Sequence, residues 1–250
     1  YGTQKKVNLT GAVGYTDSKA IENRPVASLG QAIQGAIPNL NISFGSGKPG
    51  EVTNMNIRGF ASINGESKPL ILIDGVEGSI DNLNPRDVES ISVLKDASSS
   101  AIYGARAANG VIIIKTKTPK AGKPQVRLNG YYGVAMKPTM RSTLVGTAER
   151  HLKMDLIYQY LGKPGMENVT YWITDSLNPA FNNNTDWQSN VIQKARIQNY
   201  DVNVSAYGEK TSYRLSYNFY DEEGTVIGTG FTRNTASLYL NAHPYSFLNL

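Results

Sequence analysis

The sequence predicts an α+β N-terminal domain, with a small mixed sheet and short helices, followed by a run of long antiparallel strands. Two patterns carry this prediction. Between residues 69 and 117, short apolar runs alternate with segments that can begin and end short helices. Beyond residue 124, longer segments alternate apolar and polar side chains. The length of 250 residues and the 40% hydrophobic content allow a sizeable core or two units.

The first strands of the N-terminal domain are bounded by turn and cap residues. Leu70–Ile73 is an apolar run typical of a buried strand, and it leads into Asp74-Gly75, a strong tight-turn pair. Asn84 can cap a short helix that has Pro85 at its first position. This stretch is therefore expected to fold as strand, turn and short helix.

The second half of this stretch repeats the scheme. Ser90–Lys95 alternates as a strand does, and Asp96 can cap a helix over Ala97–Tyr103 that Gly104 ends. Val111–Ile114 is a continuous β-branched run, typical of a strand covered on both faces. Together the segments predict a compact β-α-β-α-β unit with no obvious nucleophile, metal cluster or phosphate loop.

Upstream of this unit the signals are weaker. The first 27 residues are polar and rich in Gly and Thr, so no independent structure is expected there. Ser28–Ala36 has helical spacing and is followed by Pro38, and Leu40–Phe44 is predicted as a strand. Gly45–Gly50 is predicted as a loop, because it lacks the spacing of a phosphate-binding loop and Pro49 has no N–H.

Four later segments have one apolar face and one face rich in Asn, Ser and Tyr. They cover residues 126–134, 201–207, 213–220 and 235–242. The alternation alone fits the strands of a transmembrane β-barrel and the half-buried strands of a soluble sandwich equally well. Long and short connections alternate between the segments, which favours a barrel with one rim of long loops. The first long connection is predicted to contain a helix over Thr147–Tyr160.

Several ordered motifs resemble a known family. IRG at Ile57–Gly59, LILIDG at Leu70–Gly75, SISVLKDASSSAIYG at Ser90–Gly104 and ANGVIIIKTK at Ala108–Lys117 resemble the plug domain of TonB-dependent outer-membrane transporters. The opening YGTQKKVNLTGAV at Tyr1–Val13, together with KDASSSAIYGARAANG, resembles the SusC/RagA branch, which imports glycans or peptides.

The resemblance implies a division of the chain and a place in the cell. Residues 1–118 would form the plug, residues 119–124 a linker, and residues 125–250 the first strands of a large antiparallel transmembrane β-barrel. The first extracellular loop would cover about residues 136–196. The chain would be a piece of a longer protein of the Gram-negative outer membrane, with the segment gripped by TonB upstream of Tyr1.

The resemblance also implies an activity and partners. We expect active import of a large nutrient, an oligosaccharide or a peptide, with the plug gating the barrel. The expected partners are the TonB–ExbB–ExbD energising complex, a SusD-like surface lipoprotein and outer-membrane lipid, and no cofactor is expected. The alternative is a surface binding or receptor module without transport, which would use the loop that contains Trp172 and Trp187.

The same resemblance suggests which plug residues act. Three loops would face outward, at Gly45–Glu51, Ala61–Lys68 and Val76–Asn82. The ligand contacts expected on these loops are Lys48, Asn64, Glu66 and Glu77. Arg58 and Arg106 are expected at the interface between plug and barrel, in gating, although Arg58 also fits an exposed strand arginine.

Other classes of function are disfavoured by the residues. The formal charge of +5 comes from scattered Lys and Arg, so no nucleic-acid patch is expected. The neighbouring carboxylates Asp74 and Glu77, and likewise Asp87 and Glu89, fit turn and helix-start positions better than catalysis. With two distant histidines and no cysteine, a metal site is not expected. The sequence therefore predicts a protein that is not an enzyme.

Overall fold

The computed structural model describes residues 13–22, 24–57, 59, 68–96, 100–174, 177 and 183–242. The chain divides into two compact units. The first unit comprises Tyr1–Val134, Arg196–Gly224 and Thr229–Leu250, and it holds the N-terminal domain and the long strands. The second unit comprises Ala135–Ala195 and Thr225–Gly228.

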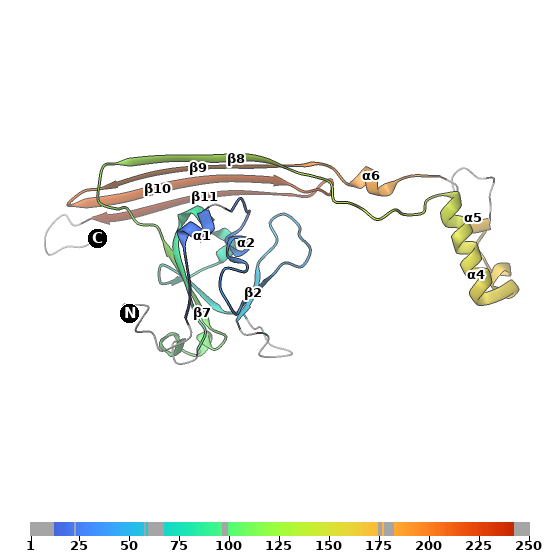
Figure 1. Ribbon diagram of the computed structural model, residues 1–250, viewed down its shortest axis with the longest axis horizontal. Helices are drawn as coiled ribbons and strands as arrows, with labels where there is room; N and C mark the ends of the chain where they lie inside the picture. The colour runs from blue at the N-terminus through green and yellow to red at the C-terminus, as the bar shows by residue number, and fades with distance from the viewer. Residues whose placement is uncertain are drawn as a thin grey trace. The chain divides into compact units, whose positions relative to one another are not determined.

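A five-stranded mixed sheet forms the centre of the N-terminal domain (Figure 1). Its strands, in spatial order, are β1 (Val13–Asp17), β6 (Val88–Leu94), β7 (Val111–Thr116), β4 (Leu70–Ile73) and β5 (Val76–Glu77). β4 runs parallel to β7, and the other neighbours are antiparallel. The predicted α+β class with a small mixed sheet is confirmed.

Short elements surround this sheet. A separate antiparallel pair is formed by β2 (Leu40–Ser43) and β3 (Asn54–Ile57). The helices are α1 (Ser18–Glu22), α2 (Leu29–Ile33) and the 3₁₀ turns η2 (Ile80–Asn82), η3 (Pro85–Asp87), η4 (Ala101–Tyr103) and η5 (Ala105–Ala107). Asn84 caps η3 as predicted, because its side chain accepts a hydrogen bond from the Arg86 N–H.

Some sequence expectations are corrected by the structure. No independent structure is predicted in the first 27 residues, and the described part of this stretch contains β1 and α1, with β1 ordered by its pairing with β6. The predicted helix Ser28–Ala36 ends early, at Ile33, although Ser28 and Gln31 form a full capping box at its start. The predicted helix Ala97–Tyr103 is described only from residue 100, and the part Ala101–Tyr103 is a 3₁₀ turn.

The Asp74-Gly75 turn joins β4 to β5 as predicted. Both residues have positive φ, at 50° and 89°, which is the backbone of a two-residue hairpin turn. The Asp74 carboxylate accepts hydrogen bonds from the Thr116 N–H at 2.9 Å and the Thr116 hydroxyl at 2.6 Å. This carboxylate therefore ties the hairpin to β7.

The long strands form a second sheet in chain order, here called the long-strand sheet. It consists of β8 (Gln125–Ala135), β9 (Ala195–Tyr207), β10 (Thr211–Glu223) and β11 (Gly230–Ala242), all antiparallel (Figure 1). On β10 the polar side chains Arg214, Ser216 and Asn218 are buried. The apolar face is exposed, with Leu215 at 50% and Leu240 of β11 at 59%. A soluble sandwich would bury the apolar face, so the barrel alternative is favoured.

The second unit is helical. It contains α4 (Thr147–Glu167), α5 (Tyr171–Thr174) and α6 (Trp187–Val191), and α4 is kinked at Gly162, which has φ 62°. The helix predicted at Thr147–Tyr160 is therefore present, but its Leu152, Leu156 and Tyr160 are exposed. Among the described residues, none of the helices combines the length and apolar character that crossing a membrane requires.

The apolar core of the N-terminal domain is made by the inner faces of the sheet and the short helices. Ile33, Val88, Ile91 and Ile112 are fully buried in one cluster. Replacing Ile112 by Ala should destabilise this domain by about 2–5 kcal/mol, because the lost contacts leave a cavity.

Hydrogen exchange of the domain amides in the intact protein would measure this loss. Ile102→Ala is the matched control, since Ile102 is 60% exposed, and it should change stability by about 0.5 kcal/mol or less. Equal effects of the two substitutions would contradict the described core.

Candidate functional site

A buried charged contact joins the N-terminal domain to the long-strand sheet. The Asp87 carboxylate, at the end of η3, accepts from Arg214 Nη2 at 2.6 Å and from Ser216 Oγ at 2.9 Å, both on β10. Asp87 is 3% exposed and Ser216 1%. The capped turn Asn84–Pro85 fixes the backbone that presents this carboxylate to the sheet.

Arg214 is held from several sides. Its Nη1 donates to the Lys117 carbonyl at 2.9 Å, and Lys117 follows the end of β7. With the Asn203 amide oriented so that its oxygen faces Arg214, that oxygen accepts from Nε at 2.7 Å and Nη2 at 2.8 Å. A planar guanidinium with this many partners has one preferred orientation. Arg214 therefore fixes the register between the sheet and the domain.

Asp201 of β9 extends the contact. Its Oδ2 accepts from Asn84 Nδ2 at 2.9 Å, and its Oδ1 accepts from Asn129 Nδ2 of β8 at 3.4 Å. Three neighbouring strands thus present polar side chains to the η3 region. We call the set Asn84, Asp87, Asp201, Arg214 and Ser216 the polar clasp.

Burial has a clear electrostatic cost at the polar clasp. Loss of solvent raises the pKa of the Asp87 carboxyl, and the positive charge of Arg214 and the hydrogen bond from Ser216 oppose this rise. A buried ion pair recovers its desolvation penalty only in part. The contact therefore determines where the N-terminal domain sits on the sheet more than it strengthens the binding between them.

A second contact lies near the opposite ends of β10 and β11, toward the connection at residues 224–229. Arg233 Nη1 donates to the Asp81 carbonyl at 3.2 Å, and the Asp81 carboxylate accepts from the Thr53 hydroxyl at 2.6 Å. At Gly50, a Cβ would lie 2.2 Å from Cδ2 of the Phe231 ring, so only glycine allows this approach. The loop Gly45–Glu51 is thereby placed at this end of the sheet.

The loop Gly45–Glu51 is organised by its own carboxylate. Glu51 accepts hydrogen bonds from the backbone N–H groups of Gly45, Ser46 and Gly47, the last at 2.8 Å. The hydrogen bond from the Ser46 N–H, with those from its neighbours, lowers the pKa of Glu51. The predicted ligand residue Lys48 is exposed in this ordered loop.

The other predicted site residues are distributed differently. Glu77 and Arg106 form an ion pair with each other within the N-terminal domain, with side chains 49% and 70% exposed. Arg58, Asn64 and Glu66 lie outside the described residues. Among the six predicted residues, the structure therefore brings together one pair. Glu77 is predicted to contact the ligand, and Arg106 is predicted to act in gating.

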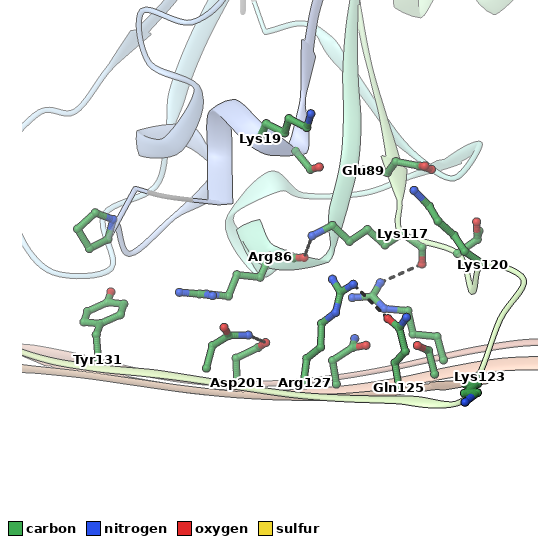
Figure 2. A pocket seen from close by; sticks show the side chains of 17 residues that line it. Lys19, Arg86, Glu89, Lys117, Lys120, Lys123, Gln125, Arg127, Tyr131 and Asp201 are labelled. Carbon is green, nitrogen blue, oxygen red and sulfur yellow. Dashed lines mark hydrogen bonds between the residues drawn. The ribbon is translucent and has the colours of Figure 1, made fainter. Parts of the chain in front are cut away.

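A polar cavity of about 800 Å³ lies between the N-terminal domain and the sheet, beside the polar clasp (Figure 2). Side chains of β8, β9 and β10 line its floor, and η3 and the segment after β7 line the other side. Across the described parts of the chain, no group of three or more His, Asp or Glu residues could hold a metal ion. The arrangement is suited to binding and to holding two bodies in register.

Sequence reasoning missed the polar clasp. It assigned Asp87 only to the start of a helix, and it gave no role to Arg214. One signal was present: Arg214 stands on the polar face of its strand among Ser212, Ser216 and Asn218. A charged residue in such a row needs a partner of opposite charge if that face is buried.

The Asp87–Arg214 pair can be tested by a double-mutant cycle. Asp87→Ala, Arg214→Ala and the double variant should show a coupling energy of about 1–3 kcal/mol for docking of the domain on the sheet. Urea-induced release, read by protease sensitivity of the N-terminal domain, measures it. The exposed pair Glu149 and Lys153 of α4 serves as the control and should give less than about 1 kcal/mol. A coupling no larger than that of the control would contradict the described interface.

The Glu51 contacts predict a pH dependence of the loop. Because the hydrogen bonds lower the pKa of Glu51, their stabilising contribution is complete above the ordinary Glu range and is lost as the pH falls through the lowered value. Amide protection factors at Gly45–Gly47 should fall at acidic pH and should be low at all pH values in Glu51→Ala. Unchanged protection in Glu51→Ala would refute the role of this carboxylate.

Comparison with known proteins places these features in a family. Residues 5–111 match the family model described as TonB-dependent Receptor Plug Domain. TonB-dependent receptor P26 of Formosa agariphila is 34% identical over 240 residues, covering 93% of this chain and 23% of that protein. TonB-dependent receptor SusC of Bacteroides thetaiotaomicron is 32% identical over 253 residues, covering 96% of this chain and 24% of that protein.

Solved structures are also similar to this chain. The RagAB peptide importer in its closed-closed state gives a TM-score of 0.79 at 29% identity, over 97% of this chain and 30% of that chain. The siderophore receptor PirA from Pseudomonas aeruginosa, at 19% identity and a TM-score of 0.53, shows the same fold.

The relatives named here are receptors and importers, in agreement with the expectation that the chain is not an enzyme. The chain spans about a quarter of the length of the curated relatives it matches. Its N-terminal domain is a plug, and its long-strand sheet is the beginning of a barrel wall. The sequence motifs, the fold and these relatives together show that the chain is SusC/RagA-like and belongs to the TonB-dependent receptors.

Proposed function

We propose that this chain serves TonB-dependent active import of a large nutrient, an oligosaccharide or a peptide, across the outer membrane. The observation that carries the proposal is which face of the long strands is buried and which face is exposed. The polar face of β10 is buried against the plug, whereas the apolar face is exposed, as a wall between lipid and a filled lumen requires. The plug would be the gate.

The division of the chain follows from this proposal. Residues 1–118 are the plug, residues 119–124 the linker, and residues 125–250 the first strands, with the first extracellular loop at about 136–196. The start of β8 at Gln125 and the helices of the second unit support these limits. The long-loop end of the sheet would face outward, and the linker end would face the periplasm.

The partners follow from the family. TonB–ExbB–ExbD would supply the energy by pulling on a segment upstream of the plug. A SusD-like surface lipoprotein would share capture of the nutrient, as the named relatives SusC and RagAB support. The exposed apolar face of the long strands would contact outer-membrane lipid.

The plug–wall interface suits a gate that must open repeatedly. Among the described residues, its polar contacts include hydrogen bonds and the buried Asp87–Arg214 ion pair, and water can replace such partners as the plug moves. An apolar interface of similar area would gain more free energy from burial and would resist opening. The polar clasp thus keeps the resting plug in register without fastening it permanently.

The outward loops remain the proposed place of nutrient contact. Support comes from Gly50 and Asp81, which meet Phe231 and Arg233 near the long-loop end of the wall. Lys48 is exposed on the same loop as Gly50. We retain Asn64, Glu66 and Glu77 as proposed contacts, and Arg58 and Arg106 as proposed gating residues.

Gating can be tested by fastening the plug to the wall. Gly50→Cys with Phe231→Cys, in a receptor otherwise free of cysteine, places two Cβ atoms close enough for a disulfide. Under oxidising conditions, TonB-dependent uptake should fall at least about tenfold, because the loop cannot leave the wall. Reduction should restore it.

The controls are the Phe231→Cys single variant, which should import normally under both conditions, and the double variant kept reduced. The Gly50→Cys single variant is not used, because its Cβ would clash with the Phe231 ring. Uptake that persists in cells with the fully formed disulfide would refute gating at this contact. Uptake that does not depend on TonB would refute active import, whereas nutrient binding without any uptake would favour a receptor without transport.

A further inference from the structure

The cavity between plug and wall is strongly basic. Seven Lys or Arg side chains and two carboxylates line it, an excess of five positive charges. The whole chain has a formal charge of +5, so the excess in this one cavity equals that of the complete sequence. The cationic side chains are Lys19, Arg86, Lys117, Lys120, Lys123, Arg127 and Arg214, and the acidic ones are Glu89 and Asp201.

The cations come from both sides of the cavity. Lys19 and Arg86 belong to the plug, Lys120 and Lys123 to the linker, and Arg127 to β8. Figure 2 shows Arg127 rising from the wall toward the plug and Arg86 lying on the plug side above it. The cavity therefore offers positive groups from two bodies that the proposed gating would move relative to one another.

Some of these cations are already engaged in holding the fold. Arg214 pairs with Asp87, and Lys117 Nζ donates to the Arg86 carbonyl at 2.8 Å. Arg127 is in a different position, because its Nη2 donates to the neutral Gln125 side chain, at 3.1 Å. Lys120, Lys123 and Arg127 are all exposed to solvent. These three can turn toward a ligand without breaking the polar clasp.

The cavity also has a defined place along the wall. Gln125 and Arg127 stand at the start of β8, Asn203 and Ser205 near the end of β9, and Arg214 near the start of β10. This is the linker end of the sheet, away from the loop Gly45–Glu51. A nutrient entering at the outward loops would reach this cavity last.

We propose that this cavity binds the carboxylate, sulfate or phosphate groups of an anionic nutrient as it leaves the barrel. The inference rests on the proposed function and narrows its substrate class to acidic oligosaccharides or peptides. A hollow whose lining carries a large excess of one sign of charge concentrates ions of the opposite sign. Lys and Arg side chains from the plug, the linker and the wall can each bind one anionic group of a ligand that carries several such groups.

Titration calorimetry on the full-length detergent-solubilised receptor tests the proposal. The probes are trigalacturonate, neutral maltotriose of equal length, and inorganic tripolyphosphate. Trigalacturonate should bind the wild-type receptor, and its affinity should fall as the ionic strength rises. Maltotriose should not bind this site. In Lys120→Gln/Lys123→Gln/Arg127→Gln the affinity for trigalacturonate should fall at least about tenfold.

Two further variants separate charge from folding. Lys120→Arg/Lys123→Arg/Arg127→Lys keeps every charge and should keep the affinity. Lys137→Gln/Arg141→Gln/Lys163→Gln removes three exposed cations of the second unit, outside the cavity, and should bind as wild type does. An equal loss in the two glutamine variants would overturn the assignment to this cavity.

The remaining outcomes are also decisive. Binding of tripolyphosphate without trigalacturonate would overturn the nutrient assignment and leave a site for small phosphates. If the cavity substitutions do not change the affinity for trigalacturonate, the assignment of its binding to this cavity is refuted. TonB-dependent uptake of a neutral nutrient, with no anion binding, would reject this inference and leave the proposed function standing.

Discussion

The buried contact between Asp87 and Arg214 determines how the two parts of the first unit meet. It links the capped turn η3 to β10, and through the Lys117 carbonyl it links the end of the plug to the same guanidinium. An arginine with this many fixed partners favours one position of the plug on the sheet over other positions. Because desolvation offsets much of the attraction, the same contact can hold a resting position and still be released.

The rest of the long-strand sheet follows from the constraint that its buried face is polar. Ser216 and Asn218 meet the plug side or their strand neighbours, and Leu215 and Leu240 face outward. This inverts the arrangement of a water-soluble sheet, and it is stable where lipid covers the apolar face. The polar lining then leaves room for a hydrated interface and for the basic cavity beside it.

Much of the fold could be predicted from the sequence because its signals are local. Leu70–Ile73, the Asp74-Gly75 turn and the Asn84 cap act within a few residues, and the structure has them as predicted. β1 could not be predicted, since its order comes from β6, more than sixty residues away. The polar clasp was missed for the same reason, because Asp87 and Arg214 are separated by 127 residues. Long-range partners of polar residues leave little trace in local composition.

We infer that the plug is held to the wall by contacts weaker than those that hold the wall together. Single-molecule pulling on the N-terminal end of the full-length receptor, embedded in a bilayer, measures this most directly. We predict that the plug detaches and extends at low force while the barrel strands stay paired. Extraction of β8 and its neighbours at or below the force that releases the plug would contradict the claim.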